Sequence, residues 1–190
     1  MKLSALVDAV RPVSCGGDMG QDVAGLTEDS RKVEKGFVFF ARKGTKSSGI
    51  DFALEAVNKG ACAVVAESSV RLPEMPCARI EVSSMHAAQS GMADVFYGHP
   101  SKDLILVGVT GTNGKTTFTY LMESLARDMG WRPAVLGTIN YRIPGASGSG
   151  SDVIPAPNTT PNVLELQRLL ALCRDRKTDL AIMEVSSHAL

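Results

Sequence analysis

The chain has 190 residues, of which 44% are hydrophobic, and its 20 basic and 20 acidic side chains leave a formal net charge of zero. This balance argues against a chain-wide attraction to nucleic acid or anionic membrane, and the sequence has neither an apolar run of membrane-spanning length nor a secretory signal. The cysteines form no Cys-x-x-Cys pair and favour a reduced cytoplasmic protein with packed thiols over a disulfide framework or zinc site; they are Cys15, Cys62, Cys77 and Cys173.

Residues 23–98 alternate short apolar runs with segments of helical periodicity. In the segment 51–60, Asp51 is a plausible N-cap and Gly60 is a typical stop for a helix. The turn-rich residues 98–103 break this pattern and mark the expected boundary between two domains. Strands are expected at 36–44, 61–67 and 78–83, and helices at 51–60 and 84–97.

An apolar strand at 104–109 opens the second region and is followed by a glycine-rich loop and a helix. The apolar residues of this helix recur at intervals of three and four, which predicts one apolar stripe of the kind that faces a core. Gly130 ends the pattern. The stripe consists of Phe118, Leu121, Met122, Leu125 and Met129.

The remaining segments predict two further strands, at 133–137 and 179–185, with a second helix between them. This helix is expected to begin at Thr160-Pro161, because proline is favoured at the first helical position. The Gly/Ser/Pro-rich residues 142–157 are expected to form an exposed loop. The stripe of the second helix consists of Val163, Leu166, Leu170 and Cys173.

This order of strands and helices predicts a parallel α/β sheet, in which ligands bind beyond the carboxyl ends of the strands. Three loops begin at such ends, namely 110–117, 138–160 and 184–190. These loops are therefore the expected positions of functional residues.

The first loop lies within Val107-Gly-Val-Thr-Gly-Thr-Asn-Gly-Lys-Thr-Thr-Phe118. It departs from the usual Gly-x-x-x-x-Gly-Lys-[Ser/Thr] spacing, because Val109 stands five residues before Gly114. A strand before the loop and a helix after it nevertheless direct several backbone N–H groups and the positive end of the helix dipole at one point. Gly111 and Gly114 permit a close backbone approach that side chains would block.

The side chains that follow add the chemistry of a nucleoside triphosphate site. Lys115 supplies a positive charge for the β- and γ-phosphates, and the Thr116 hydroxyl is placed to bind Mg²⁺. The alternative is a glycine-rich connection with a solvated lysine, which the strand–loop–helix context disfavours. The predicted ATP-binding residues are Gly111, Thr112, Asn113, Gly114, Lys115, Thr116 and Thr117.

Glu184 stands at the end of the last apolar strand, where burying a carboxylate without a cation would be costly. Oxygen ligands suit Mg²⁺, so Glu184 is a candidate ligand of that ion. The alternative is an ion pair with a nearby arginine or lysine, and the residues alone do not decide between the two.

Two further groups of polar residues have a purely structural alternative. One of Thr159 and Thr160 could cap the second helix. Asp29-Ser30-Arg31 could form an Asx-type turn, which is the preferred interpretation of that tripeptide taken alone.

Several motifs together resemble one family. "GTNGKTT" (111–117) resembles the ATP loop of the Mur ligases, which form amide bonds in peptidoglycan precursor synthesis, and of the related folylpolyglutamate synthetases. Residues 27–67 look like the UDP-binding domain of the ligases that add the third residue and the terminal dipeptide. The motifs "YGHPS" (97–101), "NTTP" (158–161) and "MEVSSHAL" (183–190) are similar to those of the third-residue-adding members.

The resemblance implies an ATP-dependent, ADP-forming amide ligase. It would phosphorylate the D-glutamyl carboxylate of UDP-N-acetylmuramoyl-L-alanyl-D-glutamate, and the amine of meso-diaminopimelate or L-lysine would attack the acyl phosphate. Lys115 and Glu184 would be catalytic, with Thr116 and Glu184 holding Mg²⁺. The substrate-binding residues that the resemblance implies are Glu28, Ser30, Thr45, Lys46, Ser47, Asn158, Thr159, Thr160 and Ser186.

The implied architecture is α/β throughout, with a small UDP-binding domain at 1–100 followed by the start of a P-loop-type, parallel-sheet ATPase domain at 101–190. A monomer is expected. The resemblance also implies a continuation beyond Leu190, so the chain is expected to be an N-terminal fragment that is inactive alone. The alternatives are the dipeptide-adding ligase and a non-catalytic nucleotide-binding module.

Overall fold

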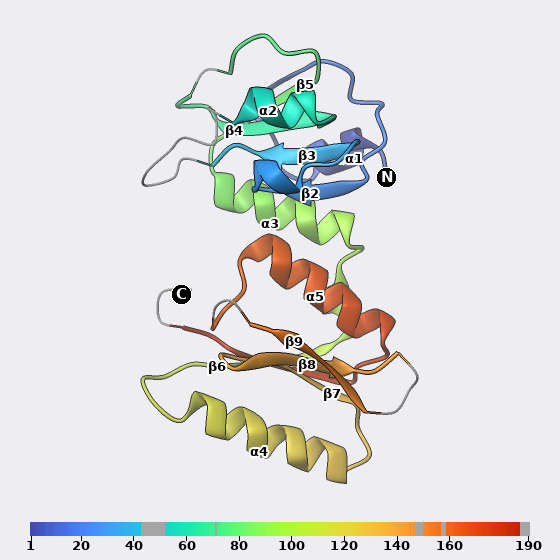
Figure 1. Ribbon diagram of the computed structural model, residues 1–190, viewed down its shortest axis with the longest axis vertical. Coiled ribbons are helices and arrows are strands. Elements are labelled where there is room, and N and C mark those ends of the chain that lie inside the picture. Colours follow the sequence, from blue (N-terminus) through green and yellow to red (C-terminus); the bar gives the residue numbers. More distant parts are fainter. Residues whose placement is uncertain (43–51, 71, 147–149, 157–158, 187–190) are drawn as a thin grey trace. The chain divides into compact units, whose positions relative to one another are not determined.

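The computed structural model describes residues 1–42, 52–70, 72–146, 150–156 and 159–186 (Figure 1). The chain forms two compact units, Met1–Phe96 and Tyr97–Leu190, here called unit 1 and unit 2. Each unit contains a five-stranded sheet and its own buried core. Among the described residues, no helix is both long and apolar enough to cross a membrane.

Unit 1 is an α/β unit whose sheet has the order β1-β5-β4-β3-β2. Strands β2 to β5 pair in parallel, and only β1 runs antiparallel to its neighbour β5. Its elements are α1 (Leu3–Asp8), β1 (Ser14–Gly16), β2 (Gly25–Thr27), the 3₁₀ helix η1 (Ser30–Lys32), β3 (Phe37–Phe40), α2 (Ala53–Asn58), β4 (Ala63–Glu67), β5 (Ala78–Val82) and α3 (Met85–Phe96).

The strands and helices predicted for unit 1 are present, although the strand expected at 36–44 covers only Phe37–Phe40, and residues 43–44 lie outside the described residues. The central strands are buried on both faces, and Phe40, Val64 and Val65 are fully inaccessible to solvent, as expected for a parallel sheet. Gly60 has a positive φ of +96° just after α2, which confirms it as the helix stop. The structure gives Phe52 as the N-cap of α2, and the predicted cap Asp51 lies outside the described residues.

Unit 2 has the sheet order β6-β10-β7-β8-β9, in which β6, β10 and β7 are parallel and β8 and β9 antiparallel. Helices α4 and α5 lie on opposite faces of this sheet (Figure 1). The elements are the 3₁₀ helix η2 (Pro100–Asp103), β6 (Ile105–Val109), α4 (Lys115–Asp128), β7 (Pro133–Leu136), β8 (Asn140–Pro144), β9 (Ser151–Pro155), α5 (Val163–Asp175) and β10 (Leu180–Glu184).

The prediction of an exposed loop at 142–157 is wrong, because most of this segment forms the hairpin β8–β9. Its residues alternate in the manner of a strand, and Tyr141 and Ile143 point into the core on one face. The Gly/Ser-rich residues lie at the tip of the hairpin, of which 147–149 are outside the described residues. Glycine and serine therefore marked a turn between two strands rather than a whole loop.

Most of the apolar stripe of α4 does not face the core, and of its residues only Met122 packs against it. Leu121, Leu125 and Met129 are 60%, 62% and 68% exposed, whereas Thr119 and Glu123 are buried. The helix packs on β10 and β7 through the side that carries Ala126. Successive residues turn by about 100° around a helix, so the stripe is rotated away from the packed side by roughly a quarter turn.

Helix α5 begins later than the sequence predicts. Its first residue is Val163, and Asn162 is the N-cap, accepting a 2.9 Å hydrogen bond from the Glu165 backbone N–H. Pro161 therefore precedes the cap, and neither Thr159 nor Thr160 caps the helix. The pattern Asn-x-x-Glu at 162–165 was the capping signal. Of the predicted stripe, Leu170 and Cys173 are buried.

The cysteines are all free, as predicted, but only three are packed. Cys62, Cys77 and Cys173 are buried, whereas Cys15 is exposed. Burial raises the pKa of the Cys62 thiol to about 11 and that of Cys173 to about 12, so both are protonated at neutral pH.

Candidate nucleotide and metal site

The glycine loop of unit 2 lies at the carboxyl end of β6 and leads directly into α4. Gly111 and Gly114 have φ values of +139° and +82°, in the region where L-residues with side chains are strained. Gly114 is the N-cap of α4, so the first backbone N–H groups of the helix point toward the loop. The two glycines thus give the loop the shape of an anion cradle.

Lys115 folds back over this loop. Its Nζ donates a 2.6 Å hydrogen bond to the carbonyl oxygen of Gly111, which holds the positive charge at the helix N-terminus. A lysine in this place adds its charge to that of the helix dipole. The arrangement suits the phosphates of a nucleotide.

Glu184 ends β10 and is only 1% exposed. Its carboxylate accepts hydrogen bonds from the hydroxyls of Thr116 and Thr138, at 3.1 Å and 2.8 Å, and from the Thr138 backbone N–H at 3.4 Å. Within the part of the chain that the structure describes, no arginine or lysine pairs with it. The ion-pair alternative is therefore wrong for these residues, and the buried carboxylate is held by hydroxyl groups.

The residues around Glu184 fit a magnesium ion. One carboxylate and two hydroxyls converge, and such hard oxygen atoms are the ligands that Mg²⁺ prefers, usually with water and substrate phosphates completing the set. The described residues contain no cluster of three or more His, Cys, Asp or Glu side chains suited to a metal. A Cβ at Gly137 would lie 2.7 Å from Glu184 Oε1, so the carboxylate fills space that only glycine leaves.

A cleft of about 510 Å³ joins these groups at the carboxyl ends of the parallel strands. It brings together the whole predicted ATP loop, the predicted metal ligands and two of the predicted substrate-binding residues. The lining residues are Gly111, Thr112, Asn113, Gly114, Lys115, Thr116, Thr117, Thr138, Thr159, Glu184 and Ser186.

Thr160 lies beside this cleft without lining it. Its hydroxyl donates to the backbone oxygen of Glu184 at 3.1 Å and accepts from the backbone N–H of Ser186 at 3.0 Å. Thr160 therefore fastens the end of β10 to the segment that precedes α5. Asn158 lies outside the described residues, as do Ser187 and His188, which follow Ser186 in the motif at 183–190.

Thr138 is the residue that the sequence did not single out. It lies two residues after the end of β7, and its hydroxyl lies between the Glu184 carboxylate and the Thr159 hydroxyl, which is 3.2 Å away. The available signal was its position at the carboxyl end of a predicted parallel strand. The order of the segments in the sequence does not show that Thr138 lies near Glu184, because β7 becomes the neighbour of β10 only in the folded sheet.

In unit 1, Glu28 lies at the end of β2 and accepts a 2.9 Å hydrogen bond from Gln89 Nε2. Ser30 is buried, and its hydroxyl donates to Glu55 Oε2 at 3.2 Å. The other predicted contacts of this unit, Thr45, Lys46 and Ser47, lie outside the described residues.

The Asx-type turn at Asp29 is confirmed. Its carboxylate accepts from the Arg31 backbone N–H at 3.0 Å and from the Arg31 guanidinium, so it caps η1. The hydrogen bond from the Arg31 side chain lowers the pKa of Asp29 to about 2. The carboxylate is thus ionised throughout the physiological range.

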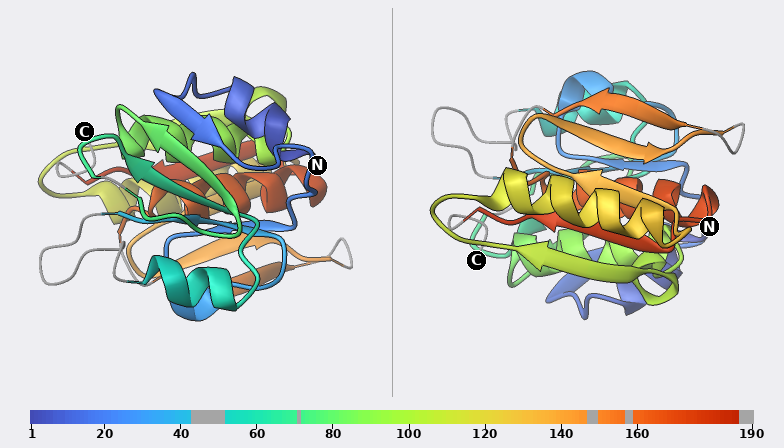
Figure 2. Two further views of the ribbon diagram at one scale, coloured as in Figure 1. Left: turned by 90° about the horizontal axis from the view of Figure 1, so that it is seen from above. Right: turned by 90° about the horizontal axis from the view of Figure 1, so that it is seen from below.

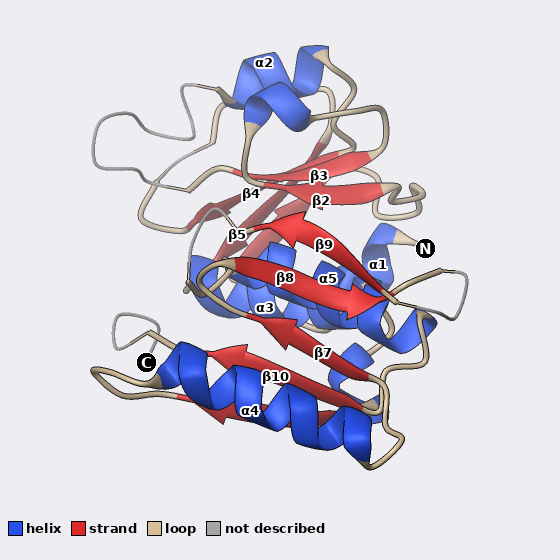
Figure 3. Cartoon of the chain, turned by 60° about the horizontal axis from the view of Figure 1, so that its bottom comes forward, coloured by secondary structure: helices blue, strands red, loops and turns tan. Residues whose placement is uncertain are grey.

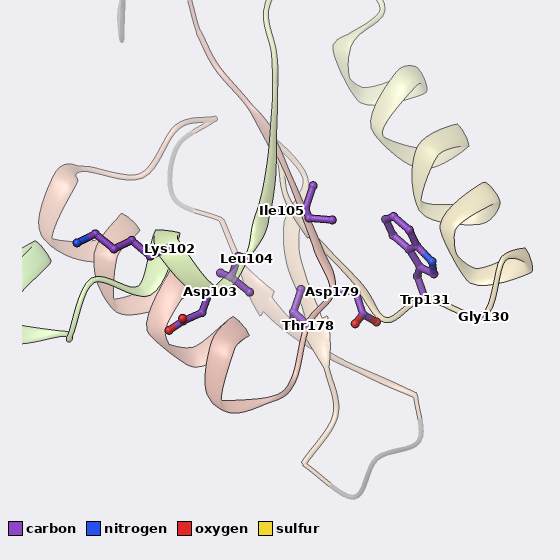
Figure 4. Close-up of a pocket in the computed structure, with 8 residues that line it drawn as sticks. All are labelled: Lys102, Asp103, Leu104, Ile105, Gly130, Trp131, Thr178 and Asp179. Atoms are coloured by element: carbon purple, nitrogen blue, oxygen red, sulfur yellow. The ribbon is translucent and has the colours of Figure 1, made fainter.

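A larger hollow, of about 580 Å³, lies at the opposite, amino end of β6 and β10 (Figure 4). Lys102 and Asp103 lie on one side of it and the indole of Trp131 on the other. It contains no predicted site residue. Ligands of parallel α/β sheets bind at carboxyl ends, so the smaller cleft is the better candidate.

Comparison with known proteins finds a matching protein-family model for each of the two units. The model described as "Mur ligase family, catalytic domain" matches residues 22–97, and the "Mur ligase middle domain" model matches residues 109–190. The chain is 45% identical to the UDP-N-acetylmuramoyl-L-alanyl-D-glutamate--2,6-diaminopimelate ligase of Geobacter sulfurreducens and 42% identical to that of Geobacter metallireducens. Both matches cover 100% of this chain but only 36% of the relative.

Solved structures agree with these matches. A UDP-N-acetylmuramoyl-L-alanyl-D-glutamate--2,6-diaminopimelate ligase has a TM-score of 0.72 and 28% identity, covering 99% of this chain and 37% of that chain. MurF ligase from Thermotoga maritima, solved in complex with ADP, has a TM-score of 0.54 and 24% identity over 85% of this chain and 32% of that one. The second likeness bears on the fold alone.

Proposed function

Because the chain belongs to the Mur ligase family, we propose that it provides the ATP-binding and acceptor-binding parts of an ATP-dependent, ADP-forming amide ligase. The acceptor would be UDP-N-acetylmuramoyl-L-alanyl-D-glutamate and the added amino acid 2,6-diaminopimelate, as in the names of its relatives. The chain spans about a third of the length of those relatives. The cleft around Lys115 and Glu184 is the observation that carries the proposal.

The reaction has two chemical steps. The acceptor's D-glutamyl carboxylate attacks the γ-phosphorus of ATP, which forms an acyl phosphate and releases ADP. The amine of diaminopimelate then attacks the acyl carbon, so that an amide forms, phosphate leaves and the amine gives up a proton. Both steps depend on positioning and charge stabilisation more than on a protein nucleophile.

Each residue of the cleft has a role in the first step. The loop N–H groups and Lys115 would hold the phosphates and stabilise charge as the γ-phosphoryl group moves. Thr116 and Glu184 would hold Mg²⁺, whose charge offsets that of the phosphate oxygens. Thr159 and Ser186, on the same cleft, would hold the muramyl peptide, and Asn158 and Thr160 are assigned to the same substrate.

In unit 1 we assign the UDP moiety to the carboxyl end of β2, where Glu28 and Ser30 follow the strand, and the residues 45–47, which lie outside the described residues, are assigned to the same moiety. The Ser30 hydroxyl is already bonded to Glu55, so Ser30 would contribute mainly through its backbone. A cytoplasmic location is part of the proposal, because the nucleotide-linked acceptor and ATP are cytoplasmic metabolites. The enzyme is also proposed to be a monomer.

The phosphate role is tested by Lys115→Ala. The substitution removes the charge at the helix N-terminus, so binding of ATP to the chain should weaken at least tenfold, and ADP release by the full polypeptide that the gene encodes should fall about 100-fold or more. Lys102→Ala, which removes an exposed lysine at the other end of the sheet, is the matched control and should leave both unchanged. Retention of most activity by Lys115→Ala would refute the role.

The acceptor is identified by a substrate panel. ADP release should require both UDP-muramoyl dipeptide and diaminopimelate, and L-lysine should replace the latter poorly. Turnover with UDP-muramoyl tripeptide and a dipeptide would instead support the dipeptide-adding ligase. ATP binding with no acceptor-dependent ADP release would support a non-catalytic module.

A further inference from the structure

We propose that Thr138 is a positioning residue that couples the magnesium and nucleotide site to the acceptor site. The proposal rests on the function proposed above. It adds that Thr138 holds the Glu184 carboxylate in place and that its hold depends on what the Thr159 hydroxyl is bonded to.

The donor and the acceptor can be assigned in each of the two hydrogen bonds of the Thr138 hydroxyl. An ionised carboxylate can only accept, so the single hydroxyl hydrogen of Thr138 must be directed to Glu184 Oε2, which is 2.8 Å away. That hydrogen is then no longer available for Thr159. The 3.2 Å contact between the two threonine hydroxyls must therefore have Thr159 as donor and Thr138 as acceptor.

The result is a chain of four polar groups that crosses the cleft. Thr159 donates to Thr138, Thr138 donates to Glu184, and Glu184 also accepts from Thr116 on the opposite side. Hydrogen bonds in such a chain polarise and strengthen one another. A substrate that accepts the Thr159 hydrogen would remove the hydrogen bond from Thr159 to Thr138 and so weaken the bond from Thr138 to Glu184. If Thr159 continues to donate to Thr138, the bond from Thr138 to Glu184 is strengthened.

The position of Thr138 makes it suited to this role and unsuited to a packing role. Its side chain is exposed to the cleft, so no core contact depends on its methyl group. The backbone before it, at Gly137, leaves room for the carboxylate to approach. The Thr138 backbone N–H reaches Glu184 only at 3.4 Å, which leaves the hydroxyl as the closer of its two contacts.

The test is a titration of the 190-residue chain with Mg²⁺ in the presence of a non-hydrolysable ATP analogue, with analogue binding as the readout. In Thr138→Val, which keeps the shape and removes the hydroxyl, the Mg²⁺ concentration for half-maximal binding should rise about tenfold, as for a lost hydrogen bond to a charged group. Binding without Mg²⁺ should be unchanged. Thr138→Ser, which keeps the hydroxyl, should stay within about twofold of the wild type.

Coupling is measured by repeating the titration with saturating UDP-muramoyl dipeptide. The acceptor should shift the Mg²⁺ midpoint of the wild-type chain and of Thr138→Ser, and should leave that of Thr138→Val in place. Thr159→Val should abolish the same shift, and adding Thr138→Val to it should give no further loss of coupling.

Distinct outcomes overturn distinct claims. An unchanged Mg²⁺ midpoint in Thr138→Val, or an equal change in Thr138→Ser, would overturn the positioning role while the proposed function stands. Equal acceptor shifts in the wild type and Thr138→Val would overturn the coupling. Failure of the wild-type chain to bind the analogue at any Mg²⁺ concentration would overturn the proposed function and this inference together.

Discussion

Strands β4 and β6 are both five-residue, strongly apolar parallel strands, yet one is buried and the other is exposed. In unit 1, Val64 and Val65 of β4 are fully buried between β3 and β5. In unit 2, Ile105 and Leu106 of β6 are 53% and 39% exposed. Strand β6 pairs with β10 on one side, and nothing pairs with its other side among the described residues.

The helices that pack on the two sheets differ in the same way, in how much of their apolar surface is buried. In unit 1, the residues that α2 and α3 bury are apolar, apart from Gln89. In unit 2, α4 lies over β10 with β6 at the edge (Figures 2 and 3), and it buries Thr119 and Glu123 together with Ala126, while most of its apolar stripe is exposed. Tyr120 and Glu123 meet Arg142 of β8, so the stripe lies on the other flank, toward β6.

The comparison teaches that apolar sequence and burial are separate properties. A strand as apolar as β6 is suited to burial on both faces, but its actual burial depends on which elements are its neighbours. Edge strands with free N–H and C=O groups and apolar surroundings are sites at which further polypeptide can pair. Substitutions in the two regions should therefore have very different effects on stability.

The largest effect on the free energy of unfolding is expected on the side of α4 that carries Glu123. Glu123 is buried and holds both Arg127 and Arg142, so Glu123→Ala would leave the largely buried Arg142 without its carboxylate partner. Such losses cost about 3 kcal/mol or more. Denaturant unfolding followed by Trp131, the only tryptophan of the chain, measures it in unit 2.

The matched control is Glu165→Ala, which breaks the more exposed pair with Arg168 and should cost about 0.5 kcal/mol. Equal costs for the two substitutions would mean that Glu123 is as well solvated as Glu165, and the polar packing of α4 would then need another explanation.

An intermediate effect is expected in β4. Val65→Ala removes two methyl groups from a fully buried site between two strands and should destabilise unit 1 by about 2 kcal/mol. Hydrogen exchange of the β4 and β5 amides measures this loss unit by unit. A cost near zero would show that the core of unit 1 relaxes around the substitution.

The smallest effect is expected in β6 and on the stripe of α4. Ile105→Ala and Leu125→Ala remove apolar groups that are already more than half exposed, so each should change the free energy of unfolding by less than about 0.5 kcal/mol. The same Trp131 measurement applies. A cost as large as that of Val65→Ala would break the comparison, because it would mean that β6 and α4 are covered in solution.

Much of the fold was predictable because its signals are local. The parallel strands of unit 2 and the glycine loop between β6 and α4 follow from apolar runs and from residues adjacent in sequence. The buried face of α4 was not predictable, because Glu123 on that face pairs with Arg142, which is distant in sequence. The hairpin β8–β9 was missed since glycine and serine outweighed a short alternation of apolar residues.

The site divides in the same way. The loop from Gly111 to Thr117 is one contiguous segment, so its members could be named together. Thr138 could not, because three segments distant in sequence meet at Glu184 only through the strand order β6-β10-β7. The roles assigned to the substrate-binding residues remain predictions.

Gly137 shows how little would be needed to alter this cleft. A methyl group there would lie only 2.7 Å from Glu184 Oε1 and would clash with it, although no hydrogen-bonding atom would be removed. The carboxylate would have to rotate out of reach of Thr138 and Thr116 or push β10 away from β7. The chemistry of the site thus depends on an absent side chain as much as on those present, because the glycine after β7 limits the directions in which the buried carboxylate at the end of β10 can point.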